Sequence, residues 1–226
     1  MKKGLIVLTN IEQYGEHERL TGLWLSELTH FYDELVKVGY EADFVSPKGG
    51  YVPLDPHSLT MLDDVDRTYY RNATFRNRAL GQTLRPEEVK VTDYELIYYT
   101  GGHGVMWDFP ESVEIAELAS QIYQNGGLVT AVCHGVAGFL PIKDEAGQPL
   151  IAGKVITGFT NQEEELNGTT GLVPFLTESA LREKGAKVEI GTAFSPVVRQ
   201  DDRILTGQNP QSARALGQAV VSKLMN

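Results

Sequence analysis

The stretch Gly127-Leu-Val-Thr-Ala-Val-Cys133-His-Gly-Val-Ala-Gly-Phe139 contains the only cysteine of the chain. An apolar run leads directly to the thiol, and His134 and Gly135 follow it. Small residues lie two positions before and two positions after the cysteine, close to the G-x-S-x-G pattern of a nucleophile elbow. The sequence therefore predicts a nucleophilic sulfur on a sharp turn between a strand and a helix. The alternative is a free cysteine that packs as a small apolar residue.

The elbow also predicts how the thiol is activated. The helix expected after Cys133 would direct its N-terminus, with its partial positive charge, at the sulfur. A positive charge favours the thiolate, which is the reactive form of cysteine. We therefore expect the pKa of the Cys133 thiol to lie below its usual range.

Short apolar runs alternate with helix-like segments along the whole chain. The expected strands cover 5–9, 41–46, 94–100, 128–132, 154–159 and 187–190, with a hairpin over 197–206 that turns at Asp201-Asp202. The expected helices cover 22–38 between Thr21 and Gly39, 108–126, a segment after Cys133, 174–184, and a last helix capped by Asn209-Pro210. This alternation is typical of an α/β fold, in which a mostly parallel sheet carries helices on both faces and binds ligands at the carboxyl ends of its strands.

The segment 49–85 interrupts this alternation. It is polar, and it contains a cluster of aromatic and basic residues: Tyr69, Tyr70, Arg71 and Arg76. We expect a single domain over residues 1–226, with a partly helical insertion at 49–85 that covers the sheet. The clustered side chains are candidates for lining the site or for a dimer contact.

The composition excludes several classes of partner. The 226 residues carry a formal net charge of −10, so we expect no binding to nucleic acid or to an anionic membrane, since both require a basic face. No apolar window is long enough for a membrane-spanning helix. The apolar run after Met1-Lys-Lys-Gly ends before Asn10 and is too short for a signal peptide, so the expected location is cytoplasmic.

Two further groups could act with the sulfur. Gly101-Gly-His-Gly104 follows the expected strand 94–100, and its N–H groups could stabilise an oxyanion; the alternative is an ordinary loop. Glu27 has mostly apolar neighbours three and four residues away along its helix, so its carboxyl could face inward and be protonated. The alternative, which the residue pattern alone favours, is a glutamate at the margin of the apolar stripe that reaches solvent.

His134 is adjacent to Cys133, and a carboxylate is expected to orient the second nitrogen of its ring. Glu163-Glu-Glu165 lies just beyond the expected strand 154–159 and could supply that carboxylate; the alternative is an exposed acidic helix start. The histidines have no metal-ligand spacing, so we predict no metal site. The glycine-rich loops lack both G-x-G-x-x-G and a Walker lysine, so we predict no nucleotide site.

Together these motifs resemble the ThiJ/PfpI superfamily, of class I glutamine amidotransferase-like fold, and in particular its heat-shock chaperone and glutathione-independent glyoxalase III branch. The resemblance covers nearly the whole chain. The matching segments are Thr21-Gly-Leu-Trp-Leu-Ser-Glu27, Asp43-Phe-Val-Ser-Pro47, Asp55-Pro-His-Ser58, Gly101-Gly-His-Gly104 with Asp108-Phe-Pro110, Ala131-Val-Cys-His-Gly135, Thr157-Gly-Phe-Thr160 with the glutamate run, and Thr206-Gly-Gln-Asn-Pro-Gln-Ser212. The resemblance implies a flavodoxin-like three-layer sandwich and a homodimer.

The resemblance also implies the catalytic residues. Cys133 is implied as the nucleophile, His134 as its partner, and Glu27 as a buried acid beside the sulfur. The third, acidic member is implied four residues after the threonine of the Gly-Phe-Thr segment. That residue is Glu164, with its two neighbours in the glutamate run as alternatives.

The remaining implied contacts concern the substrate. The N–H groups of Gly102 and His134 are implied as the oxyanion site, and Gly101 and His103 as substrate-binding residues. The implied activity is a lyase of the D-lactate dehydratase class. It converts methylglyoxal or a related 2-oxoaldehyde to a 2-hydroxy acid through a hemithioacetal on Cys133, without glutathione or a cofactor.

Three other functions stay open at this point. One is a holding chaperone for unfolded client proteins, or a redox sensor, whose cysteine is only oxidised. The others are a cysteine peptidase or amidase and a protein deglycase. Glutamine amidotransfer is disfavoured, because that reaction needs a histidine in a His-x-Glu pair and no histidine follows His134.

Overall fold

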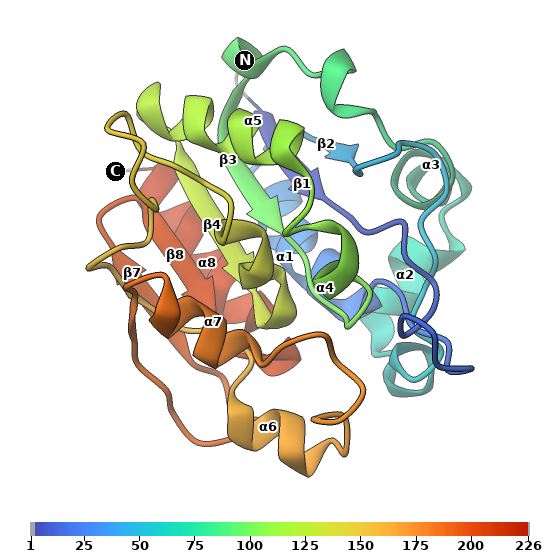
Figure 1. Ribbon diagram of the computed structural model, residues 1–226. Coiled ribbons are helices and arrows are strands. Elements are labelled where there is room, and N and C mark those ends of the chain that lie inside the picture. The colour runs from blue at the N-terminus through green and yellow to red at the C-terminus, as the bar shows by residue number, and fades with distance from the viewer. Residues whose placement is uncertain (1–2, 226) are drawn as a thin grey trace.

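A six-stranded sheet lies at the centre of the computed structural model, which describes residues 3–225 (Figure 1). In spatial order its strands are β2 (Ala42–Val45), β1 (Lys3–Val7), β3 (Tyr94–Tyr99), β4 (Leu128–Val132), β8 (Ile204–Gly207) and β7 (Val198–Asp201). The pairs from β2 to β8 are parallel, and β7 is antiparallel to β8. Asp202, with a φ of 55°, lies in the predicted hairpin turn. The N-terminal segment that predicts no signal peptide includes residues 1 and 2, which lie outside the described residues.

Helices cover both faces of the sheet. The main ones are α1 (Leu25–Lys37), α4 (Val105–Asp108), α5 (Val113–Gln124), α7 (Thr177–Glu183) and α8 (Ala213–Leu224). Alternate strand residues point to opposite faces: in β3, Leu96 and Tyr98 join the apolar cluster of α1 and α8, whereas Ile97 and Tyr99 join that of α4, α5 and α7. The predicted three-layer α/β sandwich is therefore confirmed (Figure 1). No helix within residues 3–225 is both long and apolar enough to cross a membrane.

The start of α1 differs from the prediction. The helix begins at Leu25 with Trp24 as its N-cap residue, not at Thr21. Thr21 does not cap it because its hydroxyl donates to Oδ2 of Asp55 at 3.0 Å. Gly39, with a φ of 75°, follows the end of α1 as predicted.

The predicted helix over 108–126 is divided in two. Asp108 ends α4 instead of opening a helix, because its Oδ2 accepts hydrogen bonds from the Thr9 hydroxyl and the Asn10 N–H, both at 2.8 Å. Pro110 follows and has no N–H to continue the helix. The second part, α5, starts at Val113.

Two predicted strands are shorter than expected and lie outside the main sheet. β5 (Val155–Ile156) and β6 (Lys187–Val188) pair only with each other. Side chains take the place of strand pairing beside β5: the Val155 N–H donates to Asp201 Oδ2 and the Thr157 N–H to Thr206 Oγ1, each at 2.8 Å. The chain then enters α6 (Asn161–Leu166).

A series of short helices occupies the segment that interrupts the alternation. They are η1 (Ser58–Met61), α2 (Asp64–Arg71), α3 (Ala73–Arg76) and the π-helical η2 (Asn77–Gly81), followed by η3 (Pro86–Glu88) and η4 (Val91–Asp93). The Tyr69 hydroxyl donates to Asp33 Oδ1 of α1 at 3.0 Å. This hydrogen bond helps to hold α2 against α1.

A 3₁₀ helix, η5 (Cys133–Phe139), takes the place of the α-helix predicted after the elbow. Residues three apart lie on one side of a 3₁₀ helix, which turns Gly135 and Gly138 toward β3. A Cβ at Gly135 would be 2.5 Å from the carbonyl oxygens of Tyr99 and Thr100. The tight turn thus lets the chain pass close to β3. Near the C-terminus, η6 (Pro210–Ser212) leads into α8.

Candidate active site

Cys133 lies at the carboxyl edge of the sheet, directly after β4 and beside the loop that follows β3. Its φ is 55°, in the left-handed region, which costs a non-glycine residue about 1–3 kcal/mol. The residue is only 3% exposed, yet it lines a pocket. The backbone therefore has the sharp, strained turn of an elbow, and the sulfur is reachable only through that pocket.

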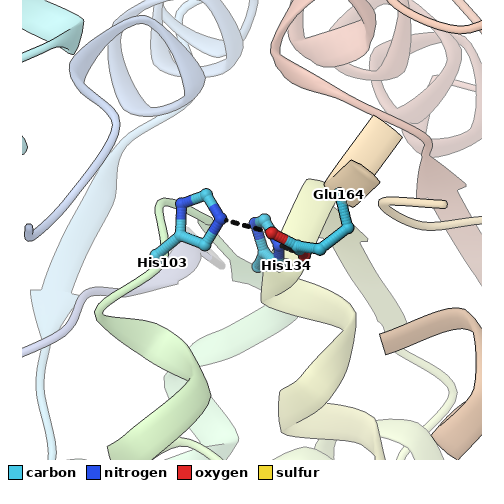
Figure 2. Close-up of side chains that lie close together, drawn as sticks. All are labelled: His103, His134 and Glu164. Atoms are coloured by element: carbon cyan, nitrogen blue, oxygen red, sulfur yellow. Dashed lines mark hydrogen bonds and ion pairs between the residues drawn. The ribbon is translucent and has the colours of Figure 1, made fainter. Parts of the chain in front are cut away.

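His134 connects Cys133 to a buried carboxylate. Sγ of Cys133 is 3.4 Å from Nδ1 of His134, and Nε2 of His134 is 2.7 Å from Oε2 of Glu164. Figure 2 shows the Glu164 carboxylate beside the rings of His134 and His103. When Glu164 accepts the Nε2 proton, a neutral His134 ring has Nδ1 free to take a proton from the thiol.

The three consecutive glutamates of α6 have different surroundings. Glu163 is buried and closes the capping box at the start of α6 with Thr160. Glu165 is exposed. Of the three, Glu164 is the one that contacts His134.

Glu164 is ionised although it is buried. Burial alone would raise its pKa, but the charge of His134 and the hydrogen bonds from His103 and His134 outweigh that effect and hold the pKa well below its usual range. Nε2 of His103 lies 2.8 Å from Oε1 of Glu164, and the Thr169 hydroxyl donates to the same oxygen. Burial, followed by the charge of His134, lowers the pKa of His103 to about 4. A neutral His103 therefore donates its Nε2 proton to Glu164.

Glu27 is fully buried in the first turn of α1, so the solvent-exposed alternative is wrong. Its Oε2 accepts the Gly101 N–H at 2.6 Å, and its Oε1 has no hydrogen-bond partner within residues 3–225. A Cβ at Gly101 would come within 2.5 Å of Oε2, so a side chain there would displace this carboxyl. Burial raises the pKa of Glu27 to about 8, against the lowering effect of hydrogen bonds with Cys133 and Gly101. The carboxyl is therefore mainly protonated at neutral pH.

The prediction of a low thiol pKa is wrong. Burial raises the pKa of Cys133 well above its usual range, the charge of Glu27 raises it further, and the N–H of His134 lowers it only in part. The positive end of a short 3₁₀ helix does not offset the loss of solvent around the sulfur. The resting site therefore holds a thiol, whose proton a neighbouring base has to remove before the sulfur reacts.

Two backbone N–H groups lie at the pocket beside the sulfur. The N–H of His134 is directed at Sγ of Cys133. Gly102 lines the pocket with a φ of 97°, and its N–H has no acceptor within the described part of the chain. A Cβ at Gly102 would lie 2.2 Å from the carbonyl oxygen of Gly22, so only glycine fits this loop. An oxygen that gains negative charge at this place would have two donors available.

A cavity of about 260 Å³ opens over Cys133. The residues that line it, apart from those already described, are Trp24, His57, Met61, Phe159, Asn167, Phe194, Pro210 and Gln211. No role was predicted from the sequence for any of them. Five of these residues lie within the family-like motifs, which could have pointed to them. Met61, Asn167 and Phe194 lie outside those motifs and had no sequence signal.

The aromatic and basic cluster of the segment 49–85 does not line this cavity. None of its four members is among the lining residues; Arg76 lies over the Tyr70 ring, with 5.7 Å between Cζ and the ring centre. The same segment instead contributes His57 and Met61 to the wall. The segment therefore reaches the site through η1 and the residue before it, not through α2 and α3.

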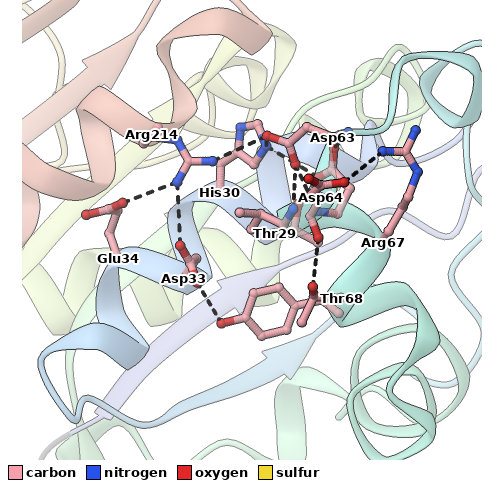
Figure 3. Close-up of polar contacts among 12 residues, drawn as sticks. Thr29, His30, Asp33, Glu34, Asp63, Asp64, Arg67, Thr68 and Arg214 are labelled. Atoms are coloured by element: carbon pink, nitrogen blue, oxygen red, sulfur yellow. Dashed lines mark hydrogen bonds and ion pairs between the residues drawn. The ribbon is translucent and has the colours of Figure 1, made fainter.

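Two clusters bring together side chains of the types that bind metals. In the first, ligand atoms of His103, His134 and Glu164 lie within 4.8 Å of one another, but hydrogen bonds among them already use the Nε2 and carboxylate atoms. The second contains His30, Asp63 and Asp66; Figure 3 shows His30 and Asp63 of this cluster.

Arg214 of α8 already supplies a cation to this second cluster. Its guanidinium lies 3.5 Å from Asp63 and 3.4 Å from Glu34, and Nε2 of His30 lies 3.0 Å from Asp63. These contacts join α1, α8 and the start of α2. The cluster therefore serves as a link between helices.

Comparison with known proteins identifies relatives over the full chain. The model of the DJ-1/PfpI family matches residues 21–223. Glutathione-independent glyoxalase HSP31 of Saccharomyces cerevisiae is 35% identical, over 100% of this chain and 99% of that protein. Glyoxalase 3 of Candida albicans is 32% identical, over 98% of both.

Solved structures agree with these matches. Rapid Encystment Protein 24 kDa of Francisella tularensis superposes with a TM-score of 0.96 at 38% identity, over 100% of each chain. Glyoxalase III from Candida albicans superposes with a TM-score of 0.88 at 31% identity, over 98% of this chain and 96% of the other.

Proposed function

Because the chain belongs to the DJ-1/PfpI family, we propose that it is a glutathione-independent glyoxalase, which converts methylglyoxal or a related 2-oxoaldehyde to a 2-hydroxy acid. One observation carries the proposal: the thiol of Cys133 lies 3.4 Å from a histidine whose other ring nitrogen contacts a buried, ionised carboxylate. Such a chain of groups can remove the thiol proton at the moment of attack. The names of the relatives at 32–35% identity support the same activity.

In the first step, the sulfur of Cys133 attacks the aldehyde carbon. A C–S bond forms and the π bond of the carbonyl opens, while the thiol proton passes to Nδ1 of His134. The N–H groups of Gly102 and His134 stabilise the negative oxygen. That oxygen then takes up the proton held by His134, which gives a hemithioacetal on the enzyme and leaves His134 neutral for the next step.

In the second step, a proton moves between the two carbons of the substrate. His134 removes the hydrogen of the former aldehyde carbon as a proton, while the protonated carboxyl of Glu27 gives a proton to the neighbouring carbonyl oxygen, which yields an enediol. Glu27 then takes back a proton from the oxygen of the former aldehyde carbon as His134 returns its proton to the neighbouring carbon. The product is a thioester of the 2-hydroxy acid. Water then attacks its carbonyl, the C–S bond breaks, and the thiol of Cys133 is restored. One water molecule is consumed and no oxidant or reductant is needed.

The proposal is tested by incubating the purified protein with methylglyoxal in the absence of glutathione. We expect D-lactate to form with the wild type and not with Cys133→Ser or Cys133→Ala. Near-normal D-lactate formation by either variant would show that the sulfur is not the nucleophile.

The redox-sensor alternative receives less support than the enzyme. Sensor cysteines are low-pKa, accessible thiols, whereas burial raises the pKa of Cys133 and leaves it 3% exposed. A homodimer, client proteins and a cytoplasmic location are further proposals that rest on the family resemblance, as is a single domain with an insertion at 49–85. Light scattering on the purified chain would test the dimer.

A further inference from the structure

The pocket over Cys133 contains no permanently charged side chain. Among the described residues, none of those lining it is a lysine, arginine, aspartate or glutamate. Its wall is largely apolar, with Trp24, Phe159 and Phe194 among its larger side chains. A ligand in this pocket therefore meets the charges of the groups packed directly behind it.

The buried groups behind the pocket are carboxyls. Glu163 and Glu164 are at most 1% exposed, and Asp55 is 5% exposed. Within residues 3–225, no lysine or arginine forms an ion pair with these three groups or with Glu27. Glu164 pairs only with two histidines, of which His103 is neutral at pH 7. The negative charge at the base of the pocket is thus not balanced by a fixed cation.

The sulfur itself lies near these carboxylates. Besides burial, the charge of Glu163 is among the causes that raise the pKa of Cys133, and the charge of Asp55 raises the pKa of Glu27 beside the sulfur. Glu27 is mainly protonated at neutral pH and adds negative charge only as the pH rises toward 8. An anion bound next to the sulfur would experience the same repulsion as a thiolate does.

We propose that this pocket selects against anions, so that neutral carbonyl compounds reach Cys133 whereas carboxylates are excluded. For the substrate, this inference rests on the proposed function: it limits the enzyme to uncharged 2-oxoaldehydes and excludes glyoxylate, in which the aldehyde carries a carboxylate. The same exclusion affects the release of the product. A neutral substrate becomes an anionic 2-hydroxy acid inside a negative site, and the repulsion promotes release of the product.

The exclusion can be measured without any assumption about the reaction. Iodoacetamide and iodoacetate alkylate thiols by the same displacement of iodide and differ in charge, and Cys133 is the only cysteine. We expect the ratio of their rates, iodoacetamide over iodoacetate, to be about tenfold higher for Cys133 than for a small free thiol. The measurement is made at pH 8 for both thiols. An equal or lower ratio would overturn the proposal.

Substitutions at the exposed edge of the pocket distinguish the effect of side-chain charge on the rate ratio from the effect of side-chain shape. Met61 is 56% exposed and lines the pocket, and Gln211 lines it from another element. Met61→Lys and Gln211→Lys should each bring the rate ratio toward that of the free thiol, and added salt should weaken this effect. Met61→Leu and Gln211→Met are the uncharged controls and should keep the wild-type ratio. A ratio that changes equally in the uncharged variants would overturn the proposal.

Anion exclusion can also be measured through the enzymatic reaction. With methylglyoxal as the substrate, added D-lactate should inhibit Met61→Lys about tenfold more strongly than the wild type. If D-lactate strongly inhibited the wild type, or if the wild type converted glyoxylate efficiently, anion exclusion would be contradicted. The glyoxalase function would stay in place. Absence of methylglyoxal turnover would instead remove the proposed function, and the alkylation ratio would still decide the selectivity.

Discussion

Glu164 and Glu165 are neighbours in the sequence, yet one is buried against two histidines and the other is exposed. Family-like spacing pointed to Glu164, but spacing could not show that His103 and Thr169 also hold its carboxylate. Nor could it give the thiol pKa of Cys133, because that value depends on burial by segments distant in sequence. Sequence motifs can thus predict which residues form the site, whereas the pKa values of these residues depend on how the folded chain packs around them.

The substitution Glu164→Gln tests the role proposed for this carboxylate. Glutamine keeps the size but carries no charge to stabilise a protonated His134, so we expect kcat for methylglyoxal to fall about 100-fold or more. Glu165→Gln is the matched control in the same helix and should leave kcat unchanged. A wild-type kcat in Glu164→Gln would exclude the carboxylate from the reaction.

At the scale of elements, the sequence predicted the strands better than the turns between them. The main strands β1, β3 and β4 are apolar runs, and each overlaps a segment that the sequence predicted to be a strand. The predicted helix after Cys133 is instead the 3₁₀ helix η5, since Gly135 and Gly138 press against β3. Sequence pattern does not reveal such a contact, because both glycines fit an α-helix as an isolated segment.

Gly135→Ala tests this close contact. An added methyl group would lie 2.5 Å from two carbonyl oxygens of the β3 end, so we expect the free energy of unfolding to fall by about 2 kcal/mol or more. Gly171→Ala is the control, since nothing lies within 4 Å of the place that its added methyl group would take and its φ is not positive. Urea unfolding curves measure both. Equal stabilities of the two variants would contradict the packing of η5 on β3.

At the scale of the whole molecule, the alternation of strands and helices predicted a mostly parallel sheet with helices on both faces, and the family resemblance implied the three-layer sandwich. The alternation did not predict which residues would be buried under the site. Glu27 lies on an α1 face that the six-stranded sheet and the β3 loop cover completely, and the residue pattern alone favoured exposure. Burial of this carboxyl links the stability of the whole fold to pH.

The sign of this linkage follows from the pKa of Glu27, which rises from an ordinary 4.5 to about 8 on folding. The folded state therefore binds this proton more tightly than the unfolded state does. The resulting contribution to the free energy of unfolding is complete below the unfolded pKa of Glu27 and is lost as the pH rises toward 8. Between these values, the free energy of unfolding of the wild type relative to Glu27→Gln should fall by about 1.4 kcal/mol per pH unit. Urea unfolding of both proteins from pH 5 to pH 8 measures it, and the comparison cancels the other titrating groups. A pH-independent difference would contradict a buried, protonated Glu27.

The central claim is a covalent bond between Cys133 and the substrate. It is tested most directly by quenching the protein with acid during turnover of methylglyoxal and locating the adduct by tandem mass spectrometry. We predict an adduct with the mass of one methylglyoxal molecule on the Cys133 peptide, together with D-lactate in solution, and neither product with Cys133→Ala. D-Lactate formed at the wild-type rate by Cys133→Ala would contradict the account.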